Sequence, residues 1–196
     1  MIDQAFITDN ISSATESFSC KKKITNQLYT LENFLTQQAL VKLYAYILNT
    51  PNKPWDLETD SDYEKMQVPR RKIAWHAESV IEELHDVMSS LTPIVNDIIK
   101  KSCDFHGLVL WEDREGYVID WHSDNPILTA TCQIYLAGPP DNPGTEFQID
   151  NNKTHICKFA PNTGYFIDQS VIRPLHRSTG QVPPSNLRYS LFGMWK

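Results

Sequence analysis

The N-terminal half of the chain shows the helical spacing of apolar side chains. In the stretch TQQALVKLYAYILN, apolar residues recur every three to four positions, at Leu40, Leu43, Tyr44, Ile47 and Leu48. Thr36 is placed to cap the start and Pro51 follows the end, so the pattern predicts one amphipathic helix. The preceding segment ITNQLYTLENFL is rich in β-forming residues and predicts an edge strand that leads into this helix.

A second helical pattern starts at Ile73 and continues to Ile99. Its apolar positions are Val80, Ile81, Leu84, Val87, Met88, Leu91, Ile94, Val95, Ile98 and Ile99. Pro93 interrupts this pattern, and Thr92 directly before it is a good start for a second, shorter helix. We expect these helices to support one face of a sheet.

The segment between the two helical regions has no periodicity. Residues 51–71 read PNKPWDLETDSDYEKMQVPRR and combine prolines with acidic side chains. This composition indicates a long surface loop, which is either a substrate lid or a plain connector.

After Ser102 the pattern changes to short β-like segments separated by Gly, Pro and Asn. They are FHGLVLWED, GYVIDWHSD, ATCQIYLAG, TEFQI, HICKFA, GYFIDQ and LRYSLFGMW. About seven or eight strands with regular turn signals indicate a sandwich or an open barrel, as in a jelly roll. The predicted fold class is therefore mainly β with N-terminal helices (α+β). We expect a single domain over 1–196, in which residues 1–102 supply the strand and supporting helices and 103–196 the β core.

Composition and charge exclude several classes of protein. With 196 residues, 41% of them hydrophobic, the chain can bury one sizeable core. A net charge of -6 repels phosphate backbones, so a nucleic acid is not expected as partner. The chain shows neither a basic leader nor an apolar stretch of membrane-spanning length, so we expect a cytoplasmic protein without a membrane partner. The cysteines Cys20, Cys103, Cys132 and Cys157 are widely spaced, which indicates reduced thiols.

The candidate chemistry begins with two histidines and one aspartate. His122 and Asp124 lie in WHSDNP, and alternation along a strand sends residues i and i+2 to the same face. His176, in PLHRS, can supply a third ligand to the same ion. Three ligands leave open positions, which suits an iron that takes up a bidentate keto acid and then dioxygen, whereas structural zinc would close its shell with a fourth protein ligand.

Three further side chains are candidates for holding that keto acid. Arg188, in LRYSLF, presents a planar guanidinium that can pair with a carboxylate in a buried pocket. Ser190 follows on the same strand face, and Tyr135 in CQIYLAG offers a phenolic proton from a neighbouring strand. This trio favours the dicarboxylate 2-oxoglutarate. Taken singly, His176 could be an ordinary strand-end histidine and Arg188 a surface arginine; their combination and order carry the prediction.

Several stretches together resemble the iron(II)- and 2-oxoglutarate-dependent dioxygenases, nearest the prolyl-hydroxylase branch. They are GYVIDWHSDNP, TCQIYL, GTEF, NTGYF, LHRS and RYSLFGMW, and the resemblance covers roughly residues 105–196. It implies a double-stranded β-helix (jelly roll) with His122, Asp124 and His176 as iron ligands. It also implies that Arg188 pairs with the tail of 2-oxoglutarate, assisted by Tyr135 and Ser190.

The resemblance implies an enzyme whose chemistry resides in the metal centre, with no further catalytic side chain. The expected cofactors are Fe(II) and 2-oxoglutarate, with dioxygen as cosubstrate and ascorbate as an auxiliary candidate. Three functions stay open: a hydroxylase of a peptidyl residue such as proline, a hydroxylase of a free amino acid or small metabolite, and a non-catalytic β-barrel binding protein. The candidates for lining the substrate pocket, each with core packing as its alternative, are Trp111, Tyr117, Trp121, Ile134 and Phe166.

Overall fold

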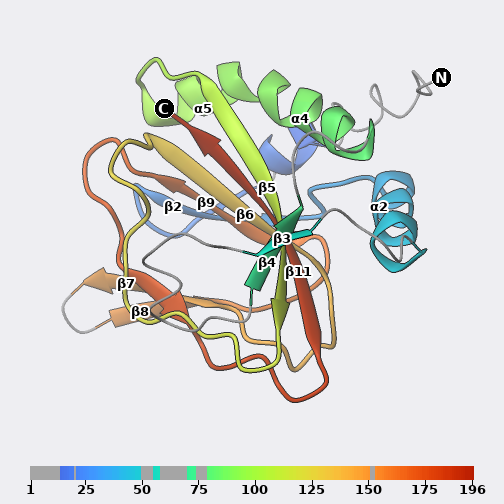
Figure 1. Ribbon diagram of the computed structural model, residues 1–196. Coiled ribbons are helices and arrows are strands. Elements are labelled where there is room, and N and C mark those ends of the chain that lie inside the picture. The colour runs from blue at the N-terminus through green and yellow to red at the C-terminus, as the bar shows by residue number, and fades with distance from the viewer. Residues whose placement is uncertain (1–13, 20, 50–54, 58–69, 74–78, 151–152) are drawn as a thin grey trace.

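Two antiparallel sheets form the body of the protein (Figure 1). The computed structural model describes residues 14–19, 21–49, 55–57, 70–73, 79–150 and 153–196. The eight-stranded sheet has the order β1 (Lys22–Lys23), β2 (Leu28–Glu32), β9 (Thr163–Asp168), β6 (Ala130–Ala137), β11 (Leu187–Trp195), β5 (Phe105–Arg114), β4 (Arg70–Ile73) and β3 (Trp55–Leu57). The three-stranded sheet has the order β10 (His176–Ser178), β7 (Thr145–Asp150) and β8 (Lys153–Cys157). This arrangement confirms the predicted β fold with supporting helices, since strands far apart in sequence pair as in a jelly roll.

The helices begin and end close to where the apolar spacing places them. They are a short helix over 14–19, α2 (Gln37–Asn49), α4 (Ser79–Ser90) and α5 (Thr92–Ile99). Thr36 Oγ1 accepts a hydrogen bond of 3.1 Å from the amide of Ala39, which confirms the predicted cap of α2. Pro93 lies in the first turn of α5, where its missing N–H costs no helical bond. Among the helices of the described ranges, none is long and apolar enough to cross a bilayer.

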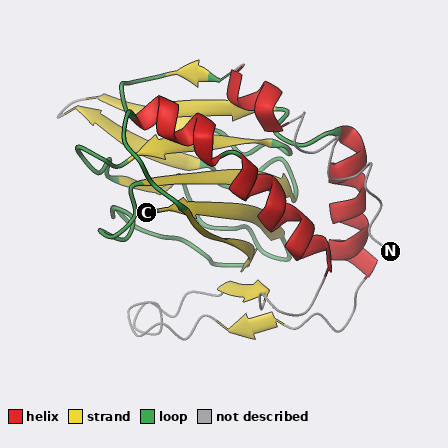
Figure 2. Cartoon of the chain, turned by 90° about the horizontal axis from the view of Figure 1, so that it is seen from above, coloured by secondary structure: helices red, strands yellow, loops and turns green. Residues whose placement is uncertain are grey.

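One hydrophobic core joins these helices to the large sheet, and Figure 2 shows the helices gathered over one face of it. Its fully or almost fully buried members include Leu40, Leu43, Val87, Met88 and Leu91 from the helical part and Leu108, Leu110, Ile134, Leu191 and Trp195 from the sheet. Burial of one such side chain contributes about 1.5–3 kcal/mol. The helices therefore hold the outer face of the sheet and leave its other face for the site.

The expected loop over residues 51–71 is partly wrong. Trp55–Leu57 and Arg70–Ile73 are strands that pair with each other, and β4 continues the sheet beside β5. Strands of three or four residues are too short to show a period of two, and pairing with the exposed edge of β5 supplies the order that the sequence pattern lacks. Ile73 consequently ends a strand, and the helix begins at Ser79. The remaining residues of the predicted loop lie outside the described residues.

The segment GYVIDWHSD was expected to be a strand, and this is also wrong. Its backbone bonds to β10 itself at irregular positions: Ile119 pairs with Ser178, and His122 forms an isolated bridge with His176. Three positions separate Ile119 from His122, whereas two separate Ser178 from His176. The extra residue breaks the ladder in the manner of a bulge. In the large sheet, β2 has only the two-residue β1 outside it, close to its expected edge position.

Candidate metal centre

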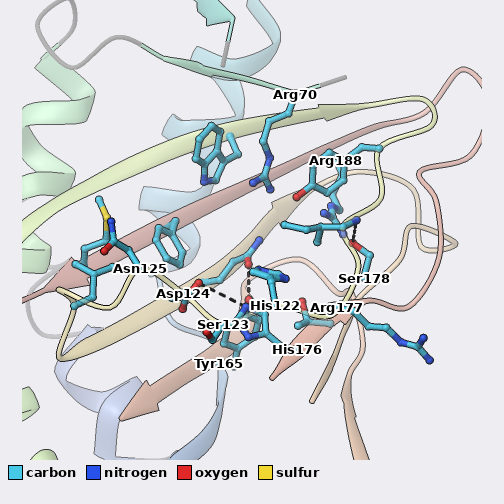
Figure 3. Close-up of a pocket in the computed structure, with 18 of the residues that line it drawn as sticks. Arg70, His122, Ser123, Asp124, Asn125, Tyr165, His176, Arg177, Ser178 and Arg188 are labelled. Atoms are coloured by element: carbon cyan, nitrogen blue, oxygen red, sulfur yellow. Dashed lines mark hydrogen bonds and ion pairs between the residues drawn. The ribbon is translucent and has the colours of Figure 1, made fainter. Parts of the chain in front are cut away.

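His122, Asp124 and His176 converge on the wall of one cavity of about 240 Å³ (Figure 3). One ligand atom from each side chain lies within 4.8 Å of the other two. His176 Nε2 is 3.6 Å from Asp124 Oδ1, and the two imidazole centroids are 4.2 Å apart. Two imidazoles and a carboxylate at this separation form a donor set that a single divalent ion can bridge. The structure therefore brings together all three predicted metal ligands.

Backbone hydrogen bonds orient both imidazoles. His122 Nδ1 lies 2.8 Å from the carbonyl of Asp120, and His176 Nδ1 lies 3.1 Å from the carbonyl of Pro174. A carbonyl oxygen can only accept, so each Nδ1 carries the proton and donates it. The lone pair is then on Nε2 of both rings, as a metal ligand requires. The main-chain bridge between His122 and His176, with bonds of 3.0 and 2.9 Å, fixes the two residues relative to each other.

Two neighbouring side chains hold the carboxylate of Asp124. Its Oδ2 accepts hydrogen bonds from Thr131 Oγ1 at 2.8 Å and from Gln169 Nε2 at 3.0 Å. Gln169 Nε2 is also 3.0 Å from Thr131 Oγ1, so the three side chains form one network. Because Oδ2 is used in this way, Oδ1 is left to face the imidazole of His176.

The electrostatics of His122 and Asp124 favour the protonation states that metal binding needs. Burial lowers the pKa of His122, and the charge of the neighbouring His176 lowers it further. Burial opposes ionisation of Asp124, but the adjacent imidazole of His176 and the hydrogen bond from Thr131 bring its pKa below the usual value. A neutral imidazole and an ionised carboxylate bind metal without first releasing a proton.

Arg188 also lines the cavity, and it is already paired. Its Nε and Nη2 donate to Asp113 Oδ2 at 2.9 and 2.7 Å, and its Nη1 donates to the carbonyl of Pro143. Arg70, at the start of β4, approaches the same aspartate from the other side, with Nε 2.5 Å from Oδ1. Figure 3 shows the two arginine side chains approaching each other above the metal-binding triad. The cavity therefore has a metal-binding wall and a cationic wall.

Tyr135 and Ser190 lie behind the cavity, and among the described residues they are not part of its lining. Both are completely buried. Tyr135 Oη is 2.7 Å from Thr145 Oγ1, and Ser190 Oγ accepts a bond of 3.0 Å from Gln133 Nε2. Thr145 and Gln133 themselves line the cavity.

The candidates for the substrate pocket divide into three groups. Trp111 and Tyr117 line the cavity as expected. Ile134 and Phe166 are completely buried in the hydrophobic core and are core residues instead. Trp121 is 37% exposed, and its ring packs 4.6 Å from the guanidinium carbon of Arg177. Strand alternation explains why Ile134 and Phe166 are not in the pocket, because both side chains point to the helix-covered face of the sheet.

A scan against protein-family models finds no match to this chain, and neither does a search of the curated proteins. Solved structures do match. A prolyl-4-hydroxylase from Pseudomonas putida superposes with a TM-score of 0.66 at 10% identity, covering 95% of this chain and 98% of that chain. The chain has the fold of the 2-oxoglutarate- and iron(II)-dependent oxygenases.

Two further matches agree with this fold. An oxidoreductase of the 2OG-Fe(II) oxygenase family from Burkholderia pseudomallei gives a TM-score of 0.60 at 13% identity, over 100% of this chain and 92% of that chain. A prolyl hydroxylase from Trichoplax adhaerens, in complex with a peptide fragment of the hypoxia inducible factor oxygen degradation domain, gives 0.57 at 13% identity, over 100% and 94%. The resemblance inferred from the sequence is thus confirmed at the level of the fold.

Sequence reasoning missed the residues that support the predicted ones. Thr131 and Gln169 hold Asp124, Arg70 is part of the cationic wall, and Asp113 pairs with both of its arginines. Asp113 is the last residue of the β-like segment FHGLVLWED, where an acidic side chain gives no sign of burial. His106 is exposed and also contributes to the cavity lining.

Proposed function

We propose that the protein is an iron(II)- and 2-oxoglutarate-dependent hydroxylase that acts on a peptidyl residue such as proline. One observation carries this proposal: the triad of His122, Asp124 and His176 shares a cavity with the buried guanidinium of Arg188. A metal site and an anion site in one cavity match the two ends of a keto acid that carries a distal carboxylate.

The donor set fits iron. Two neutral imidazoles and one carboxylate leave coordination positions open for small ligands, which is typical of non-haem iron sites that activate dioxygen. When bound, iron(II) together with 2-oxoglutarate and dioxygen supplies the oxidising chemistry that hydroxylates a carbon atom. His122, Asp124 and His176 hold the ion in this scheme.

The cosubstrate would extend from the metal toward Arg188. The bonds to Asp113 and Pro143 use three of the five N–H groups of this guanidinium, and the other two have no partner among the described residues. Tyr135 and Ser190 belong to the same pocket in this proposal. Each would act through the cavity-lining residue to which it is bonded, Thr145 for Tyr135 and Gln133 for Ser190.

A peptidyl substrate is supported by relatives in the fold and by the surface beside the metal site. Two of the similar structures are prolyl hydroxylases, and one of them holds a peptide. Exposed apolar side chains lie in the two segments that lead to the ligands: Trp121, Ile127, Val171, Ile172 and Leu175. Exposed apolar side chains in these segments suit an extended peptide, and the net charge of -6 favours a basic one. The cytoplasmic location, the use of ascorbate and the single-domain organisation remain predictions.

The decisive experiment measures succinate formation from 2-oxoglutarate with iron(II) and ascorbate, and in parallel the gain of oxygen by the substrate. Proline-containing peptides are compared with free amino acids. His122→Ala and Asp124→Ala should abolish turnover while the fold is retained, because the domain has its own core. His85→Ala, a half-exposed histidine packed on Phe105, is the matched control and should leave turnover unchanged.

Each result separates the possible functions. Turnover with free amino acids alone would favour the hydroxylase of small metabolites. Absence of succinate with every substrate would favour a binding protein without catalysis. Wild-type turnover in both ligand variants would refute the metal centre itself.

A further inference from the structure

Asp113 lies between two arginines in one row of the large sheet. It is opposite Arg70 in the pairing of β5 with β4 and opposite Arg188 in the pairing of β5 with β11. The two arginines bind this carboxylate from opposite sides: Oδ1 accepts from Arg70 Nε at 2.5 Å, and Oδ2 accepts from Arg188 Nη2 at 2.7 Å and from Arg70 Nη2 at 3.4 Å. Together the three ionised side chains carry one positive charge.

This cluster is buried and closely packed. The side chains of Arg70, Asp113 and Arg188 are 8%, 0% and 3% exposed. The guanidinium carbon of Arg70 lies 4.3 Å from the ring centres of both Trp111 and Tyr117, and that of Arg188 lies 5.2 Å from Tyr117. Aromatic faces stabilise cations in such positions and keep water away. Both arginines line the cavity that contains the metal-binding triad.

The charge balance gives Arg70 a specific task. If Asp113 had Arg188 as its only partner, the two charges would cancel, and the cavity wall would be neutral toward an anion. With Arg70 present, Asp113 is neutralised from the other side, and these three side chains together keep one positive charge beside the two N–H groups of Arg188 that have no partner among the described residues. In a buried site, one unit of charge changes anion affinity strongly.

We propose that Arg70 is a positioning and specificity residue that neutralises Asp113 and thereby leaves the charge of Arg188 available for the distal carboxylate of 2-oxoglutarate. The inference rests on the proposed function, because it assumes that this carboxylate binds at Arg188. It predicts that the pocket discriminates between keto acids with and without a distal carboxylate, and that the discrimination depends on a residue of β4.

The test is direct binding of 2-oxoglutarate to the Mn²⁺-loaded protein, measured by calorimetry. Arg70→Gln should raise the Kd for 2-oxoglutarate by about tenfold or more. The Kd for 2-oxobutanoate, which lacks the distal carboxylate, should stay unchanged, as should the Kd for Mn²⁺. The double variant Arg70→Gln, Asp113→Asn restores the net charge and should return the 2-oxoglutarate Kd to within about threefold of wild type.

Two further variants keep the test interpretable. Arg114→Gln is the matched control: Arg114 Nε is 2.9 Å from the buried Glu112 on the same strand, so its loss also removes a cation from a buried acid, but away from the cavity lining. It should leave the 2-oxoglutarate Kd unchanged. Arg70→Lys keeps the charge, so its Kd for 2-oxoglutarate should remain close to that of the wild type. This variant replaces Arg70→Gln in the test if the glutamine variant does not fold, and a Kd raised tenfold in it would contradict the charge-balance role.

The outcomes distinguish this inference from the proposed function. A 2-oxoglutarate Kd that stays at the wild-type value in Arg70→Gln, or equal weakening for both keto acids, would overturn the inference alone. A double variant as weak as the single one would likewise refute the charge-balance role. Failure of the wild-type Mn²⁺ form to bind 2-oxoglutarate would overturn the proposed function, and this inference with it.

Discussion

The hydrogen bonds that Asp124 accepts should determine how tightly the site holds its metal. Thr131→Val keeps the shape of the side chain but removes the hydroxyl that donates to Asp124 Oδ2 at 2.8 Å. Gln169→Leu removes the second donor, at 3.0 Å. Both changes leave the metal-binding atoms in place, so any effect on affinity reports the orientation and charge of the carboxylate.

The expected magnitude follows from the two bonds. A hydrogen bond to a charged group contributes about 1.5–3 kcal/mol, and 1.4 kcal/mol corresponds to a factor of ten. After the loss of Thr131 the carboxylate keeps its bond from Gln169, so the single variant should lie near the lower limit, about tenfold weaker in Mn²⁺ or Fe²⁺ Kd. Removal of both donors should weaken binding by about a hundredfold, within the range for residues that support metal ligands.

The assay is metal titration followed by calorimetry under anaerobic conditions, with thermal unfolding of the metal-free protein as a check of the fold. Thr145→Val is the matched control, since Thr145 also lines the cavity but bonds to Tyr135 rather than to Asp124. Its metal Kd should equal that of the wild type. A metal Kd that is unchanged in the double variant would refute the assignment of Asp124 as a ligand oriented by these two side chains.

Two further predictions concern stability. Burial opposes ionisation of Asp113, but the charges of Arg70 and Arg188 lower its pKa below the ordinary 3.8, so its stabilising effect is present above that pH and is lost as the pH falls toward the lowered value. Asp113→Asn should therefore lower the free energy of unfolding at pH 7 and flatten its decline between pH 5 and 3 in urea titrations, and parallel slopes would contradict this. Phe166→Ala should cost about 3–5 kcal/mol of unfolding free energy, because the ring is completely buried among Phe18, Tyr29 and Trp195. This variant should leave the 2-oxoglutarate affinity of the folded protein unchanged. A small loss of stability together with weaker 2-oxoglutarate binding would instead indicate that Phe166 lines the pocket.

Periodicity predicted the elements that bury one continuous face. The apolar pattern of α2, α4 and α5 extends over enough residues to define a helix. The interruption that Pro93 predicts lies where α4 ends and α5 begins. It failed for β3 and β4, which are too short to show alternation, and for residues 117–124, where an extra residue interrupts pairing. In these segments the order comes from bonds to distant backbone, which no local pattern records.

The structure brings the three predicted metal ligands together, although the local geometry predicted for them was partly mistaken. His122 and Asp124 do not lie on a regular strand; the bridge to His176 and the network of Thr131 and Gln169 bring the three side chains together. Their orientation needed contacts across the fold.

By itself, the sequence determined the helices, the β character of the second half and the identity of the side chains that can bind a metal, since these depend on residue type and short-range spacing. Only the tertiary structure decided that Asp113 would lie between Arg70, 43 positions before it, and Arg188, 75 positions after it. The physical reason is that the charge of a buried site is a sum over neighbours in the sheet. Strand order sets those neighbours, and pairing between distant segments sets strand order.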